Sequence, residues 1–193
     1  MSGPGIPPAV MPVVLGIGTH RYSDLGVTCL DLADLAFASG SDRFHANRPV
    51  IAHPPRHACA RLNMQANGRH RQRERDQAMW ALDQVRAWGG VLEHPAHSSL
   101  WTDADLPPVG AQRDQCGGIT LPVWLSWWGS DRPHPTWLYL VGYDRHQMPA
   151  MPLQLGGERS GAGDGFARWL LDLAVTIGND QAWRYGSQQA IPC

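Results

Sequence analysis

The sequence predicts a single α/β domain over residues 1–193, with a truncated Rossmann-like, mainly parallel sheet, flanking helices and a long Trp/Gly/Pro-rich loop. Three observations predict this fold. The chain has the length of one domain. Five short apolar runs bounded by turn residues have the length of buried strands. A helical period separates the third run from the fourth, and the order strand, helix, strand is typical of parallel sheets.

The predicted strands follow a Gly/Pro-rich segment, residues 1–12, which we expect to be irregular. They comprise residues 13–17, 26–31, 49–53, 90–94 and 136–142. The connection between the first two strands is too short for a full helix. The third strand ends at Pro54-Pro55, which can continue neither a strand ladder nor a helix.

Two helices are predicted from the spacing of their apolar residues. The first spans residues 71–90 and stops at Gly89-Gly90, and its apolar face comprises Ala78, Met79, Leu82, Val85 and Trp88. The second spans residues 164–177 with Asp164 as its N-cap, and its apolar face comprises Phe166, Trp169, Leu170, Leu173 and Ile177.

Two segments have no sustained period. Residues 102–135 are rich in Gly, Pro and Trp, and we expect an irregular excursion over one face of the sheet. Loops of this length in compact domains tend to be functional. The tail, residues 178–193, is expected to be loosely held.

Composition limits the partners and the compartment. All sixteen basic residues are arginine, and the formal net charge is −1, so any nucleic-acid contact must be local rather than a product of bulk charge. The sequence has no apolar run of membrane length and no export signal, which predicts a cytoplasmic protein that does not use a membrane. The four cysteines are far apart and form no C-x-x-C pair, which favours reduced thiols: Cys29, Cys59, Cys116 and Cys193.

The segments "HPPRH" (53–57) and "EHPAHSS" (93–99) follow two strands that one helix joins. Because ligands bind outside the carboxyl ends of parallel strands, His53 and Glu93 are expected to lie on one rim. A glutamate among histidines there would have the perturbed proton affinity of a general acid or of a group that reads a base edge. Alternatively, Glu93 caps the next turn or pairs with an arginine such as Arg61.

The neighbouring side chains leave further alternatives open. Four histidines are a candidate metal site or ordinary hydrogen-bonded loop residues: His53, His57, His94 and His97. Their spacing favours the second reading, and no metal is expected. Cys59 is a candidate nucleophile, activated by Arg56 and His57, or a small apolar filler.

Nucleotide chemistry has two weaker signals. Gly16-x-Gly18 after the first strand is a short form of a nucleotide-cradling turn, and Asp31 ends the second strand where it can meet a ribose hydroxyl. The run "RHRQRERD" (69–76) places arginines at a helix start, where the helix dipole does not favour them. That run indicates either a phosphate partner or a solvated face.

The order of "HPP", a helix, "VLEHPAHSSLW" and "PTWLYLVG" resembles shortened DNA-methylase-like proteins of bacteriophages and prophages. These are distantly similar to carbon-5 cytosine DNA methyltransferases. The resemblance covers roughly residues 26 to 175. It implies a nucleic-acid base as substrate, S-adenosylmethionine as cofactor, and the cytoplasm of a host cell as the compartment. A phage or host protein is an additional candidate partner, and the oligomeric state is not predicted.

Carried over by residue, the resemblance makes Glu93 the group that holds the base. It aligns Pro95, Ser98, Trp101, Thr136 and Trp137 with the motifs of the family. The nucleophilic cysteine of the family corresponds to Arg56, and His94 replaces an asparagine. Three alternatives follow: Cys59 reaches the base, Arg56 stabilises an oxyanion or phosphate, or the protein only holds a flipped base.

The sequence therefore predicts a methyltransferase-like protein that modifies DNA bases. Its predicted catalytic residues are Glu93, His53, Arg56, His57 and Cys59; cofactor binding is assigned to Gly16, Gly18 and Asp31; and substrate binding is assigned to Arg61, His94, Ser98, Trp101 and Thr136. Two other hypotheses remain. One is a non-catalytic protein that docks on DNA or protein through Trp124, Trp127 and Trp128. The other is a metal-dependent hydrolase.

Overall fold

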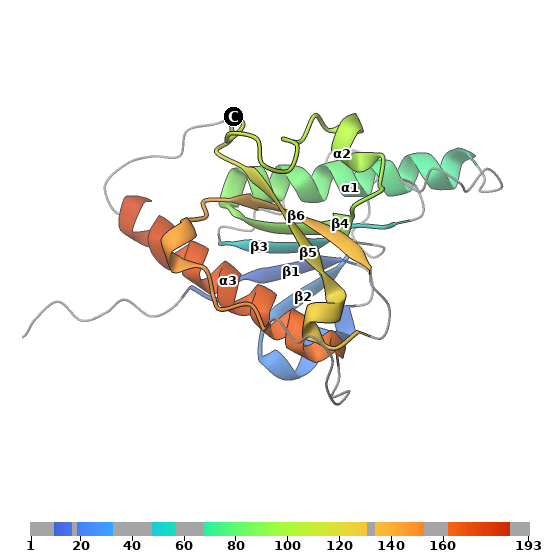
Figure 1. The fold of residues 1–193 in the computed structure, drawn as a ribbon. Helices are drawn as coiled ribbons and strands as arrows, with labels where there is room; N and C mark the ends of the chain where they lie inside the picture. The colour runs from blue at the N-terminus through green and yellow to red at the C-terminus, as the bar shows by residue number, and fades with distance from the viewer. Residues whose placement is uncertain are drawn as a thin grey trace, which may run out of the picture.

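A computed structural model describes residues 10–16, 19–32, 48–56, 68–130, 134–152 and 162–185. Within these ranges six strands form one sheet, in the order β2-β1-β3-β4-β6-β5 (Figure 1). The strands are β1 (Val13–Gly16), β2 (Thr28–Asp31), β3 (Val50–His53), β4 (Gly90–Pro95), β5 (Ile119–Trp124) and β6 (Pro135–Val141). The α-helices are α1 (Gly68–Trp88), α2 (Leu100–Asp103) and α3 (Ala162–Tyr185). The 3-10 helices are η1 (Thr19–Leu25), η2 (Leu125–Trp128) and η3 (Arg145–Gln147).

The sheet is mostly parallel. Strands β2, β1, β3 and β4 pair in parallel, whereas β6 pairs antiparallel with both β4 and β5. Helix α1 covers one face and α3 covers the other (Figure 1). The α/β class with flanking helices is therefore as the sequence predicts. Because both faces are covered, β1, β3 and β4 are buried along nearly their whole length, and all three begin with apolar residues or glycine.

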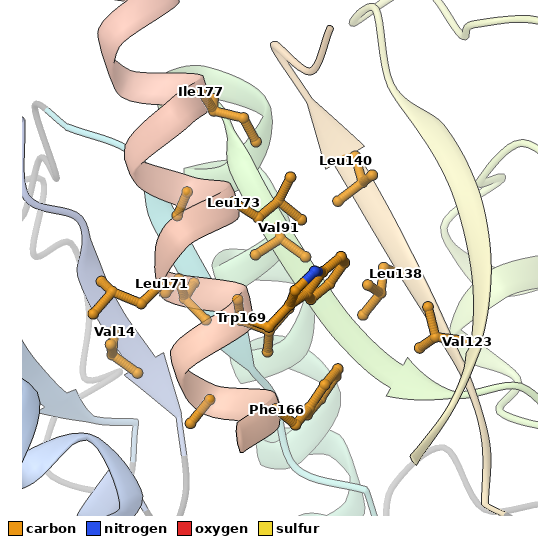
Figure 2. Packing of buried hydrophobic residues seen from close by; sticks show 14 of the residues in the cluster. Val14, Val91, Val123, Leu138, Leu140, Phe166, Trp169, Leu171, Leu173 and Ile177 are labelled. Carbon is orange, nitrogen blue, oxygen red and sulfur yellow. The ribbon is translucent and has the colours of Figure 1, made fainter. Parts of the chain in front are cut away.

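The apolar faces of both long helices are confirmed. On α1, Ala78, Leu82 and Val85 are fully buried against the sheet. On α3, the predicted residues are buried against β4 and β6; Figure 2 shows Trp169 and Leu173 beside Val91, Leu138 and Leu140.

The glycine that begins β4 is required for a steric reason. Helix α1 stops at Trp88, and Gly90 has a φ of 126°. A Cβ on Gly90 would lie 2.0 Å from the carbonyl oxygen of Val50 on the neighbouring strand. Only glycine fits this approach, so α1 turns directly into β4.

The predicted irregular excursion over residues 102–135 is wrong in its middle. Strand β5 and helix η2 lie there, and β5 is an edge strand that pairs with β6 alone. Pro122 lies within β5, opposite Trp137. Proline is tolerated on an edge strand because one side of that strand has no ladder partner for its missing N–H. The proline and glycine content of this segment therefore led the sequence analysis to miss strand β5.

Two boundaries of α3 also differ from the prediction. The helix begins at Ala162, so Asp164 lies inside it and is not its N-cap. It continues to Tyr185, so the first part of the predicted loose tail, residues 178–185, is helical. Residues 186–193 lie outside the described ranges.

Candidate functional site

Four strand ends line up at the carboxyl edge of the parallel part of the sheet. Gly16 is in register with Asp31 on one side and with His53 on the other. Ala52 is in register with Leu92, so His53 and Glu93 are the next neighbours across β3 and β4. The chain passes from β1 to β2 on one side and returns to β3 on the other, so this edge contains the switch point where open α/β sheets bind ligands.

Glu93 is the centre of a hydrogen-bonded cluster at this edge. His53 Nδ1 lies 2.9 Å from Glu93 Oε2, and Arg56 Nη2 lies 3.2 Å from both carboxylate oxygens. The Glu93 side chain is 3% exposed, whereas that of Arg56 is 53% exposed. Burial alone would raise the pKa of Glu93, but the hydrogen bond from His53 and the positive charge of Arg56 lower it to about 2. Glu93 is therefore an anion at neutral pH.

Tyr22, from η1, completes the cluster. Its hydroxyl lies 2.7 Å from His53 Nε2, and its side chain is fully buried. Because ionised Glu93 only accepts hydrogen bonds, Nδ1 of His53 donates to it; in the neutral ring Nε2 then accepts from the Tyr22 hydroxyl. Burial and the negative charge of Glu93 raise the pKa of Tyr22 well above its usual value. The sequence reasoning missed Tyr22; its one signal is a tyrosine inside the short connection at the switch point.

Gly16 makes room for His53. A Cβ on Gly16 would lie 2.7 Å from the Cβ of His53 and 2.9 Å from its carbonyl oxygen. Any larger residue would push β1 away from β3 at the point where His53 turns towards Glu93. The glycine at the end of β1 is thus explained by packing against the site.

His94 points to the other face of β4, towards α1. It is fully buried, and its Nε2 donates to the carbonyl oxygen of Pro55 over 3.3 Å. Among the described residues its Nδ1 has no partner. Burial lowers the pKa of His94 to about 4, so the ring is neutral at pH 7. Its contact fastens the double-proline corner of β3 to the end of β4.

The structure therefore brings the two predicted segments together. Arg56 of "HPPRH" contacts Glu93, and His94 of "EHPAHSS" contacts Pro55. The arginine that pairs with Glu93 is Arg56, and Arg61 lies outside the described residues, as do Gly18, His57 and Cys59.

The other predicted substrate-binding residues make contacts inside the turn after β4 and near the start of β6. Ser98 Oγ accepts a hydrogen bond from the Leu100 N–H, and Trp101 Nε1 donates to the carbonyl of Pro95 at 2.8 Å. Thr136 is 3% exposed and its hydroxyl faces the His134 carbonyl at 3.4 Å. The contacts of Ser98 and Trp101 order the turn that follows β4, and Thr136 is held at the start of β6.

The residues of the two competing hypotheses lie in different parts of the fold. His53 and His94 lie on opposite faces of the sheet, and the described ranges contain no group of three metal-ligating side chains. Of the three tryptophans proposed for docking, Trp128 is 5% exposed and packs on Phe166 and Trp169, whereas Trp124 is 42% exposed. No helix in the described part of the chain has the length and apolar character needed to cross a membrane.

Comparison of the chain with protein-family models, with curated proteins and with solved structures gives no match.

Proposed function

We propose that this protein holds a nucleic-acid base at the carboxyl edge of its sheet, as a methyltransferase-like protein that modifies DNA bases. The observation that carries the proposal is Glu93, a buried anionic carboxylate that is hydrogen-bonded to His53 beside the switch point. Buried carboxylates with strongly shifted pKa values are typical of functional sites.

The chemistry of the pair suits the edge of a base. Glu93 offers oxygen acceptors, and the guanidinium of Arg56 offers a fork of N–H donors. Nucleobase edges place N–H donors next to ring or carbonyl acceptors, and carboxylates accept from the amino group of cytosine. Because Arg56 is half exposed, its side chain can turn outward and admit a flipped base to Glu93.

Arg56 holds and polarises a base but does not attack it. A guanidinium stays protonated in proteins and has no lone pair to offer a carbon centre. In this structure it donates to both oxygens of Glu93. The proposed activity therefore includes no covalent attack by residue 56.

The fit of S-adenosylmethionine rests on Asp31. This carboxylate ends β2, where acidic residues of nucleotide-binding sheets meet ribose hydroxyls. Gly16 is already explained by its approach to His53. Bound at this edge, the cofactor would supply the methyl group, and Asp31 is the residue that we propose to hold its ribose.

The start of α1 supports a nucleic-acid partner. Gln77 of α1 donates to the carbonyl of Leu32, just after β2, and Arg75 pairs with Asp103 of α2, which follows β4. Both contacts place the start of α1 at the same sheet edge as Glu93. Figure 1 shows this end of α1 extending beyond the sheet. Arg69 and Arg73 are exposed there, where they can meet phosphates.

A ligand-binding experiment tests the proposal. We expect single-stranded oligonucleotides, nucleosides or S-adenosylmethionine to raise the melting temperature of the wild-type protein, because a ligand that binds only the folded state stabilises it. Glu93→Gln should lose the response to bases, whereas Asp83→Asn, on an exposed position of α1, should keep it. A wild-type protein that responds to none of these ligands, or a Glu93→Gln variant with an unchanged response, contradicts the proposal.

The salt dependence of binding tests the arginines. Each phosphate contact contributes roughly 0.7 to the slope of log affinity against log salt for single strands. We expect the double variant Arg69→Gln/Arg73→Gln to make this negative slope shallower by about 1.4. Arg145→Gln is the control, because η3 follows β6 at the opposite edge of the sheet. Equal slopes in both variants would remove the arginines from the proposed interface.

A further inference from the structure

We propose that Tyr22 is a positioning residue that acts through His53. Its hydroxyl holds His53 in the Nδ1–H tautomer, so that Glu93 presents an acceptor-only carboxylate to the ligand. The ligand part of this inference rests on the proposed function, whereas the tautomer does not.

The hydrogen bonds of the cluster all run towards Glu93. The Tyr22 hydroxyl donates to His53 Nε2 at 2.7 Å, and His53 Nδ1–H donates to Glu93 Oε2 at 2.9 Å. Arg56 donates from the other side. The ring of His53 thus has a partner for each nitrogen: Glu93 requires a donor at Nδ1, and in the neutral ring the Tyr22 hydroxyl donates to the lone pair on Nε2.

The opposite tautomer conflicts with these contacts. It would turn the lone pair of Nδ1 towards an anionic carboxylate oxygen at 2.9 Å, which places two acceptors face to face. Relief comes from a proton on Nδ1, because the pKa of Glu93, at about 2, opposes a proton on the carboxylate. Glu93 and Tyr22 therefore fix the ring of His53 together.

The Tyr22 hydroxyl does more than fill space. Tyr22 is fully buried in the apolar cluster under α3, where a phenylalanine of the same shape would pack without a polar atom. A buried hydroxyl is unfavourable unless it has a partner, and His53 is the partner here. Arg21 lowers and Cys29 raises the pKa of Tyr22 through their charges, whereas the hydrogen bond of its hydroxyl is to His53.

The same burial excludes a catalytic role for Tyr22. The combination of hydroxyl, imidazole and carboxylate has the order of a nucleophile triad. With no exposed surface, however, the Tyr22 hydroxyl cannot touch a ligand. It acts on the ligand only through the orientation of His53 and the hydrogen bonds that remain free on Glu93.

Nitrogen NMR of the full chain with ¹⁵N-labelled histidine tests the tautomer, with His53 assigned by a His53→Gln variant. We expect the wild-type spectrum at pH 7 to show a protonated Nδ1 and a non-protonated, hydrogen-bonded Nε2. Tyr22→Phe should shift the Nε2 resonance towards that of a free acceptor. Tyr143→Phe is the matched control, because Tyr143 lies in the same apolar cluster but follows β6 at the opposite edge. A protonated Nε2 in the wild type, or an Nε2 resonance that Tyr22→Phe leaves in place, overturns the inference.

Binding of a short single-stranded oligonucleotide supplies the second readout. We expect Tyr22→Phe to weaken binding about fivefold, the effect of one ordinary hydrogen bond, and Tyr143→Phe to leave it unchanged. If the Nε2 resonance moves but affinity does not, the positioning role is overturned. If the wild-type spectrum shows the expected tautomer and no nucleic acid binds, the proposed function fails while the tautomer assignment stands.

Discussion

Glu93 and His94 are neighbours on β4 and nearly equally buried, yet one is charged and the other neutral. Glu93 faces η1 and α3, where His53 and Arg56 direct N–H donors at it. His94 faces α1, and its hydrogen-bond partner among the described residues is the carbonyl of Pro55. Burial opposes charge on both residues, so the difference comes from their partners.

Strand β4 therefore has a charged side, which carries Glu93, and a neutral side, which carries His94. On the Glu93 side the register of β1, β3 and β4 brings polar side chains together at the switch point. On the His94 side a neutral ring fastens one backbone corner. Strand β4 thus carries the candidate binding residue Glu93 on one face and, on the other, His94, whose hydrogen bond holds the backbone at Pro55.

The largest expected effect comes from breaking the charged side. His53→Ala removes a hydrogen bond from a buried anion, and leaving such a charge underpaired destabilises proteins by about 4 kcal/mol. Chemical denaturation at pH 7 measures this loss. His53→Asn retains an N–H donor near the Nδ1 position and should recover part of it.

His146→Ala is the control for that measurement, because His146 is exposed in η3. Equal losses in His53→Ala and His146→Ala would show that Glu93 does not depend on His53.

The neutral side predicts a loss of stability on mild acidification. The folded protein holds the pKa of His94 at about 4, below the ordinary value of 6.5, so the unfolded chain binds a proton first. Its contribution to stability is complete above pH 6.5 and is lost as the pH falls to 4, by up to about 3 kcal/mol. His94→Gln should flatten the free energy of unfolding in this window relative to the wild type. Parallel curves for the two proteins contradict the prediction.

The charged side predicts a second loss at lower pH. The pKa of Glu93 is about 2 in the folded protein and 4.5 ordinarily, so its stabilisation is present above pH 4.5 and declines towards pH 2. The loss is again up to about 3 kcal/mol. Glu93→Gln should remove it while leaving the window of His94 in place. A wild-type curve that coincides in shape with that of Glu93→Gln below pH 4.5 would show that Glu93 is not held ionised.

On the charged side, the sequence predicts the positions of His53 and Glu93 but not the contribution of Tyr22. Apolar runs that end in His53 and Glu93 were enough to place both residues on one rim, because parallel strands end on the same edge. Tyr22 could not be placed in this way, since a 3-10 turn between two strands has no periodicity to reveal which residue points inward.

The strand that sequence reasoning missed has a physical explanation as well. Pro122 interrupts the pattern of β5, and edge position, which tolerates proline, is a property of the finished sheet. Likewise, the sequence favours a nucleotide-cradling turn at Gly16, whereas its close approach to His53, which also requires glycine, is visible only in the folded sheet.

The smallest expected change in stability is at Arg56. Its contacts with Glu93 are at 3.2 Å, but its side chain is 53% exposed, so solvent screens the pair and Arg56→Gln should cost less than about 1 kcal/mol. His53 lies deeper and keeps its own hydrogen bond, so the variant should remain folded at pH 7. Denaturation and oligonucleotide binding measured on the same preparation separate two roles for Arg56. A ligand-facing arginine gives near-native stability with weakened binding, whereas a purely structural one gives the reverse. The first outcome would make Arg56 the movable part of a cluster whose fixed part is Tyr22, His53 and Glu93.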